Sequence, residues 1–142
     1  MARVVVDTNV LVSALINNGK SRKLVSKLLD EHTVILSSQM LAELADVISR
    51  DKFSVTSSQI DRFISILVKK ATIVSVRSIS KVILEDPNDD VVLSTALSGK
   101  ADYIVSGNKH LLKIACYKNT QIVSVNQFIQ IIPNVKEYLE SK

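Results

Sequence analysis

The stretch that decides the fold is Arg3-Val4-Val5-Val6-Asp7-Thr8-Asn9-Val10-Leu11-Val12. Its unbroken run of β-branched residues predicts a strand that is buried on both faces. Asp7 follows this run directly, Asn9 adds a second polar group, and residues 10–16 predict a helix. Ligands of open α/β sheets bind at the carboxyl ends of the strands, so Asp7 occupies a position typical of a functional site. An Asp before a helix is also a common N-cap, and this stretch alone does not separate the two roles.

The rest of the chain alternates short apolar runs with longer segments of helical periodicity. Further strands are predicted at 33–36, 72–76, 103–105 and 121–123. Helices are predicted at 20–30, 38–50, 57–70, from Pro87 to a C-cap near Gly99, after each of the last two strands, and at 135–139. Alternation of this kind indicates a parallel sheet covered by helices. We therefore predict one α/β domain over residues 1–142, a three-layer α/β/α sandwich with a five-stranded parallel sheet.

The composition is that of an ordinary globular domain with a real core. Of the 142 residues, 46% are hydrophobic and 23% are charged. No apolar run reaches the roughly 18 residues that a membrane span needs, and the first residues lack a signal-peptide cleavage pattern. The single cysteine, Cys116, excludes an internal disulfide. Because one unpaired cysteine fits a reducing compartment, we expect a cytoplasmic protein without a membrane partner.

The net charge of +4 weakly favours a polyanionic partner. The basic residues are spread over short groups, most of which are typical of solvated helix faces. The candidates for steering phosphates toward an acidic site are Lys20, Arg22, Lys23, Lys109 and Lys113, with ordinary surface charge as the alternative. Aromatic residues make up 4% of the chain, too few for a surface on which single-stranded nucleic acid stacks.

Several segments bring polar side chains to one edge of the predicted sheet. Asp7 ends the first strand, Glu43 lies early in the helix after the second, Asp89 and Asp90 begin the helix before the fourth, and residues 106–108 follow the fourth. Grouped carboxylates repel one another and favour the binding of a cation. Oxygen ligands without a His or Cys cluster favour Mg²⁺ or Mn²⁺ over zinc.

The acidic residues around position 88 differ in how strongly they indicate a functional role. Asp86 and Asp89 are explained by the start of a helix, as an N-cap and as a charge near the positive end of the helix dipole. Asp90 falls on the side expected to face the sheet, and a carboxylate there is costly unless it binds a partner. The other residues predicted on this side are Leu93, Ser94 and Leu97. Asp90 is therefore the stronger functional candidate. Glu43 stays ambiguous, because most glutamates lie on the surface.

Together these motifs resemble the PIN domain family, and in particular its VapC-related toxins of toxin–antitoxin systems. The resemblance is carried by residues 4–15, 37–44, 86–93 and 101–112, in order and at family-like spacing, over essentially the whole chain. It implies a ribonuclease that cleaves RNA phosphodiester bonds with Mg²⁺ or Mn²⁺. It also implies a five-stranded parallel sheet, in agreement with the prediction from the residues.

The resemblance also implies roles for single residues. Asp7, Glu43 and Asp90 match the family's core acidic positions, which are catalytic and hold the metal. Asn108 matches a fourth metal-site position that is often Asp, in a segment that here reads Ser106-Gly107-Asn108 where Thr-Gly-Asp is usual. The residues expected to support the site are Asn9, Ser106 and Asp89.

The expected partners are RNA, a cognate antitoxin protein and a second copy of the chain. The homodimer is predicted from the apolar stripe of the 57–70 helix, formed by Ile60, Phe63, Ile64, Leu67 and Val68. The alternative is that this stripe is buried within a monomer.

Other interpretations of the first motif are weaker or stay open. Haloacid-dehalogenase phosphatases normally have a second Asp two residues after the first, where this chain has Asn9. A dinucleotide-binding module is disfavoured, because the chain has 3 glycines and none is grouped after the first strand. The open alternative is a catalytically weak or inactive PIN domain that binds RNA or a protein.

Overall fold

The computed structural model describes residues 2–50, 54–76 and 87–131. Its strands are β1 (Arg3–Val6), β2 (Thr33–Ser37), β3 (Thr72–Val74), β4 (Tyr103–Val105), β5 (Cys116–Tyr117) and β6 (Thr120–Val123). Its helices are α1 (Thr8–Ile16), α2 (Lys20–Glu31), α3 (Ser38–Arg50), α4 (Ser57–Lys70), α5 (Pro87–Ser98), α6 (Lys109–Ile114) and α7 (Val125–Ile131). The N-cap predicted at Asp86 and the helix predicted at 135–139 lie outside the described residues.

The strands form one sheet in the order β3-β2-β1-β4-β6-β5. The five predicted strands are present and pair in parallel, although β3 ends at Val74, two residues earlier than predicted. The predicted sheet of five strands is incomplete, because β5 adds a sixth strand that runs antiparallel to β6. Strand β5 has only 2 residues and is joined to β6 by a tight turn in which Lys118 has a φ of 57°. Such a short segment shows no periodicity.

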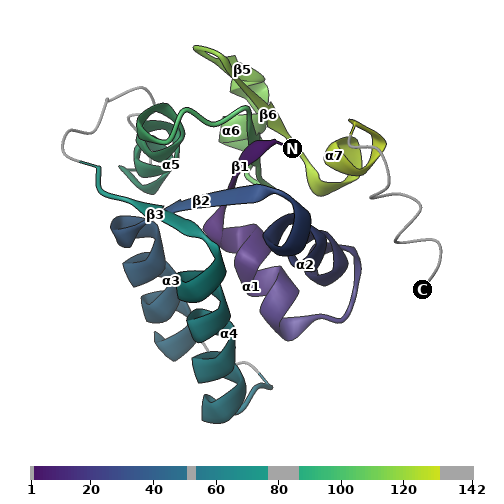
Figure 1. Cartoon of the computed structure of the whole chain (residues 1–142), viewed down its shortest axis with the longest axis vertical. Coiled ribbons are helices and arrows are strands. Elements are labelled where there is room, and N and C mark those ends of the chain that lie inside the picture. Colours follow the sequence, from purple (N-terminus) through teal and green to yellow (C-terminus); the bar gives the residue numbers. More distant parts are fainter. Residues whose placement is uncertain (1, 51–53, 77–86, 132–142) are drawn as a thin grey trace.

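The helices cover both faces of the sheet, which confirms the three-layer architecture. Figure 1 shows α1 to α4 on one side of the sheet and α5 and α6 on the other. This distribution follows from right-handed crossovers, because the chain moves from β1 to β3 in one direction and from β4 to β6 in the other. Among the described residues, no helix is long and apolar enough to cross a membrane.

The opening strand lies at the centre of the core. Val4, Val5 and Val6 are each 0% exposed, as expected for a strand covered on both faces. Strand β1 pairs with β2 on one side and with β4 on the other. The position of Asp7 is therefore fixed by the most buried part of the sheet.

Helix α5 ends close to the predicted position. The sequence predicts Gly99 as its C-cap, but the structure requires a glycine there for packing. The residue with left-handed backbone is Lys100, with a φ of 51°. A Cβ atom on Gly99 would lie 2.6 Å from Cγ2 of Ile35 in β2. Glycine therefore allows the end of α5 to approach the sheet closely.

The apolar stripe of α4 is used mostly inside the chain. Leu67 is 0% exposed, and Ile60, Phe63 and Ile64 are partly buried against the core. Val68 is 52% exposed. This distribution accounts for most of the stripe without a second copy, and the homodimer stays a prediction.

His32 joins the end of α2 to the start of β1. Its Nδ1 accepts a hydrogen bond of 2.9 Å from the backbone N–H of Ala2. A nitrogen that accepts this bond carries no proton. Burial lowers the pKa of the His32 imidazole below its ordinary value.

This lowered pKa predicts a loss of stability in mild acid. The unfolded chain takes up the His32 proton at a higher pH than the folded chain does, so stability is lost as the pH falls from above about 6.5 through the lower folded-state pKa. Urea unfolding between pH 8 and pH 5 measures this slope, which His32→Gln should reduce. Equal slopes in the wild type and His32→Gln would contradict the prediction.

Candidate functional site

The candidate site lies where the strand order of the sheet reverses. The chain leaves β1 toward β2 and β3, and α5 then returns it to β4 on the other side of β1. Connections that leave in opposite directions open a crevice at the carboxyl ends of the strands, where α/β proteins bind ligands. Val6 pairs with Val105 in adjacent parallel strands. The next residues, Asp7 and Ser106, are therefore neighbours at this crevice.

The Asp7 carboxylate is buried and held through both oxygens. Asp7 is 7% exposed. Its Oδ1 accepts a hydrogen bond of 2.7 Å from the backbone N–H of Thr8, and its Oδ2 accepts one of 2.7 Å from the hydroxyl of Ser106. Asp7 is the N-cap of α1. It also contacts the segment after β4, so the capping role does not exclude a role in the site.

Two further hydrogen bonds extend this contact to the start of α5. The backbone N–H of Asn108 donates to Oγ of Ser106 at 2.9 Å. The Nδ2 atom of Asn108 donates to Oδ1 of Asp89 at 2.7 Å. We call these four residues, Asp7, Ser106, Asn108 and Asp89, the carboxylate network. It joins the ends of β1 and β4 to the first turn of α5.

Asn9 makes a contact beside the carboxylate network. Its Oδ1 accepts a hydrogen bond of 3.3 Å from the backbone N–H of Gly107. This bond ties the first turn of α1 to the turn between Ser106 and Asn108. Asn9 thereby supports the loop that carries two members of the network.

The first turn of α5 carries two buried carboxylates. Asp89 and Asp90 are each 4% exposed. Burial of Asp90 agrees with the prediction that its side of the helix faces inward, but Leu97 on the same predicted side is 47% exposed. The interpretation of Asp89 as mainly a helix-start charge is wrong, because Asp89 is buried and bonded to Asn108. This contact joins residues 19 positions apart, and helical periodicity does not predict it.

Glu43 is half-buried in α3 and is not a member of the carboxylate network. Within the described residues, no group of three or more His, Cys, Asp and Glu side chains is arranged so that it could hold a metal ion. The side chains in their present arrangement therefore do not form a metal site, and the convergence of Asp7, Glu43 and Asp90 around an ion stays a prediction. Asp7 and Asp89 instead direct oxygens at hydrogen-bond donors of the chain. The buried side chains nevertheless offer oxygen atoms as ligands, and oxygen ligands fit Mg²⁺ or Mn²⁺.

Arg22 and Lys20 contact the protein itself. The Arg22 guanidinium donates to the carbonyl oxygens of Ala14 and Leu15 at 2.8 and 2.7 Å, and so satisfies the C-terminal end of α1. The Lys20 ammonium lies 3.3 Å from Oδ1 of Asn126. The contacts of Arg22 indicate a structural role, which the sequence pattern did not predict.

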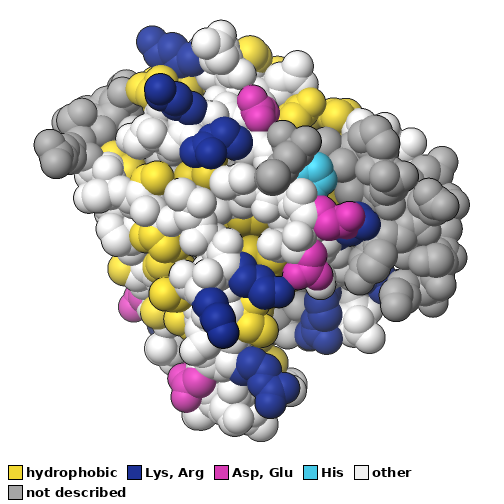
Figure 2. All heavy atoms as spheres, viewed as in Figure 1, with side chains coloured by type: hydrophobic (Ala, Val, Ile, Leu, Met, Phe, Trp, Pro, Cys, Tyr) yellow, Lys and Arg dark blue, Asp and Glu magenta, His cyan; other side chains and the backbone are white. Residues whose placement is uncertain are grey.

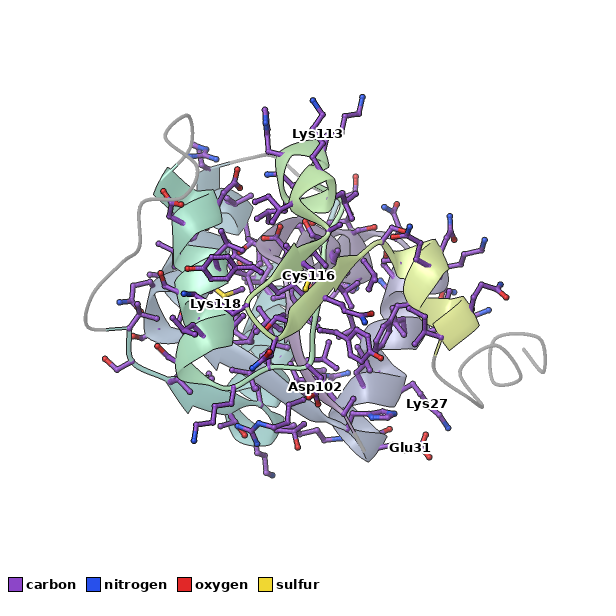
Figure 3. All side chains as sticks on the ribbon, turned by 90° about the horizontal axis from the view of Figure 1, so that it is seen from above. Lys27, Glu31, Asp102, Lys113, Cys116 and Lys118 are labelled. Atoms are coloured by element: carbon purple, nitrogen blue, oxygen red, sulfur yellow. The ribbon has the colours of Figure 1, made fainter. Side chains whose placement is uncertain are left out.

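The other basic candidates differ in exposure. Lys109 and Lys113 are exposed on α6, directly after Asn108, and Lys23 is half-buried on α2. Figure 3 shows Lys113 projecting outward, at the opposite end of the view from Asp102, which precedes β4. Figure 2 shows Lys and Arg side chains spread over the visible face, without one dominant patch. Steering of phosphates stays a prediction, strongest for Lys109 and Lys113.

A separate groove lies between α1, α2 and α4. It has a volume of about 410 Å³. Its walls include Leu15, Val25, Leu29, Phe63, Ile66 and the stem of Arg22. No member of the carboxylate network lines this groove, so it is distinct from the candidate site.

Comparisons with known proteins identify the fold and the family of the chain. Residues 3–110 match the family model described as PIN domain. A solved structure of VapBC2 from Rickettsia felis bound to a DNA fragment from its promoter is 20% identical, with a TM-score of 0.63, over 86% of this chain and 98% of that chain. PAE2754 from Pyrobaculum aerophilum is 11% identical, with a TM-score of 0.60, over 99% of this chain and 91% of that chain. None of the curated proteins matches.

The structural likeness at these low identities establishes the fold. The family model goes further, because it matches more than half of the chain and includes Asp7, Glu43, Asp90 and Asn108. The chain belongs to the PIN domain family.

Proposed function

We propose that this protein is a divalent-metal-dependent ribonuclease, the toxin of a toxin–antitoxin pair. Its family and its likeness to a VapBC complex support a VapC-type toxin nuclease at the family level. The observation that carries the proposal is the burial of Asp7, Asp89 and Asp90 beside the crevice at β1 and β4. Buried carboxylates are costly, and their concentration at a ligand-binding edge favours a role in binding and chemistry.

The proposed reaction is hydrolysis of an RNA phosphodiester bond. Mg²⁺ or Mn²⁺ held by Asp7, Glu43, Asp90 and Asn108 would offset phosphate charge and activate water. The Ser106 hydroxyl and the Thr8 N–H orient the Asp7 carboxylate, which limits its rotation. A site carboxylate accepts the proton of the attacking water, so no protein nucleophile is required.

Loss of either core carboxylate on the sheet edge should stop RNA cleavage. We expect Asp7→Asn and Asp90→Asn to lower the metal-dependent cleavage of single-stranded RNA by about 100-fold or more, because each removes a proton acceptor and a hard ligand. The fold should persist, since each change removes charge from a crowded cluster. Cleavage of a labelled RNA, with circular dichroism as the folding check, measures both.

The matched control for this experiment is Asp61→Asn, the same change at an exposed position on α4. It should cleave like the wild type. Full activity of Asp7→Asn or Asp90→Asn would overturn the site assignment.

Divalent metal should stabilise the folded protein. A ligand that binds only the native state raises the thermal midpoint, by about 5 °C or more at a concentration about 100 times its Kd. We expect this shift with Mn²⁺ or Mg²⁺ in the wild type and a smaller one in Asp90→Asn, measured against EDTA. Identical shifts in the two proteins would show that the ion binds elsewhere.

A non-catalytic PIN domain is the second candidate function. Two observations favour it. Asp7 and Asp89 accept hydrogen bonds from protein donors. Among the described residues, no cluster of three or more His, Cys, Asp and Glu side chains is arranged to hold a metal. Binding of single-stranded RNA, without cleavage at any concentration of Mg²⁺ or Mn²⁺, would support this candidate and exclude the ribonuclease.

A cognate antitoxin is the proposed protein partner. The similar structure from Rickettsia felis is described as VapBC2 bound to a promoter DNA fragment. By analogy, we propose that this chain forms a complex with an antitoxin that inhibits it. Co-expression with the product of an adjacent open reading frame tests the pairing, and the expected result is a stable complex with reduced RNA cleavage.

We also propose a homodimer. The exposed large apolar side chains include Ile66 and Val68 on α4, Ile73 on β3 and Leu97 on α5. Their burial against a second copy would remove apolar surface from water. Light scattering at micromolar concentrations should give twice the chain mass of 15.7 kDa. The mass of a single chain across the whole concentration range would refute the dimer.

A further inference from the structure

Asn108 has an amide whose orientation is fixed by the backbone. Its Oδ1 accepts a hydrogen bond of 2.8 Å from the N–H of His110, at the start of α6. A backbone N–H is only a donor, so the atom that faces it must be the amide oxygen. The amide nitrogen consequently faces Asp89 Oδ1 at 2.7 Å.

The backbone N–H of Asn108 determines which way the Ser106 hydroxyl donates its hydrogen bond. Its N–H donates to Ser106 Oγ at 2.9 Å. Ser106 accepts this bond and directs its hydroxyl proton to Asp7 Oδ2 at 2.7 Å. Asn108 therefore supports the Asp89 carboxylate directly and the Asp7 carboxylate through Ser106.

The burial of these groups makes the choice of side chain at position 108 consequential. Ser106 is 0% exposed, Asp89 is 4% exposed and Asp7 is 7% exposed. Asn108 itself is half-buried, so water only partly screens the contact between its side chain and Asp89. A carboxylate at position 108 would face Asp89 as a like charge and would need a proton or a cation between the two groups.

We propose that Asn108 is a positioning residue that orients the carboxylate of Asp89 through a direct hydrogen bond to Oδ1 and that of Asp7 through Ser106. The amide forms the link that a carboxylate at position 108 would form only with a cation. The carboxylate network is thus assembled in the folded chain before any metal binds. The expected effect of metal on the variants rests on the proposed function, but the positioning role of Asn108 does not.

The first test is the thermal midpoint in the presence of EDTA. We expect Asn108→Asp to lower the midpoint by about 5 °C or more, because it places a half-buried carboxylate against the buried carboxylate of Asp89. Asn18→Asp makes the same chemical change at an exposed turn position and should leave the midpoint within about 1 °C of the wild type.

The second test reverses the polarity of the hydrogen bond. Combining Asn108→Asp with Asp89→Asn restores one amide and one carboxylate, and position 108 still offers an oxygen to the His110 N–H. We expect the double variant in EDTA to recover more than half of the midpoint lost by Asn108→Asp. Such recovery is a coupling between the two sites that a purely local packing defect would not produce.

Two outcomes would overturn the positioning role. One is an Asn108→Asp midpoint in EDTA equal to that of Asn18→Asp. The other is a double variant no more stable than Asn108→Asp. Neither measurement involves metal or RNA, so failure here is distinct from failure of the ribonuclease proposal.

Metal titration extends the test to the proposed function. Mn²⁺ should raise the midpoint of Asn108→Asp more than that of the wild type, because the cation offsets the new like-charge contact. In a different outcome, the midpoint of the double variant recovers in EDTA while Mn²⁺ changes the midpoint of neither the wild type nor Asn108→Asp. That result would support the positioning role and refute the metal site.

Discussion

The buried carboxylate of Asp7 is the constraint on which the rest of the site depends. A charge at the end of a fully buried strand is tolerated only when donors replace the water that it loses. The Thr8 N–H and the Ser106 hydroxyl supply those donors. One comes from the first turn of α1 and the other from the end of β4, so the charge is stabilised only when β1 and β4 are adjacent. Sheet topology and site electrostatics are therefore coupled.

The sequence predicted the features that depend on local patterns. The valines of β1, the spacing of apolar residues in α2 to α4 and the gathering of polar residues at one sheet edge all follow from periodicity and from the geometry of parallel sheets. The features that it missed are tertiary. Burial of Asp89 depends on Asn108, the role of Arg22 depends on the end of α1, and Gly99 is required by Ile35 across a helix–sheet contact. None of these contacts repeats along the chain.

The fold also explains why the arrangement of the polar side chains was harder to predict than the sheet edge at which they lie. Strand order determines which segments meet at the crevice, but side-chain torsions determine which oxygens converge. In this structure both oxygens of Asp7 and Oδ1 of Asp89 accept hydrogen bonds from protein donors. Residue types at family positions therefore identify the donors without fixing their arrangement.

The contact between Asn108 and Asp89 shows how a single departure from the usual family pattern changes the physics of an acidic site. With a carboxylate at position 108, the contact with Asp89 would form only when a cation or a proton offsets the two like charges. With an amide, assembly uses the hydrogen bonds of the chain, and a cation has fewer negative groups to offset. The amide therefore lowers the electrostatic cost of folding this acidic edge. It does so with both of its polar atoms, because Nδ2 donates to Asp89 while Oδ1 accepts from the N–H of His110.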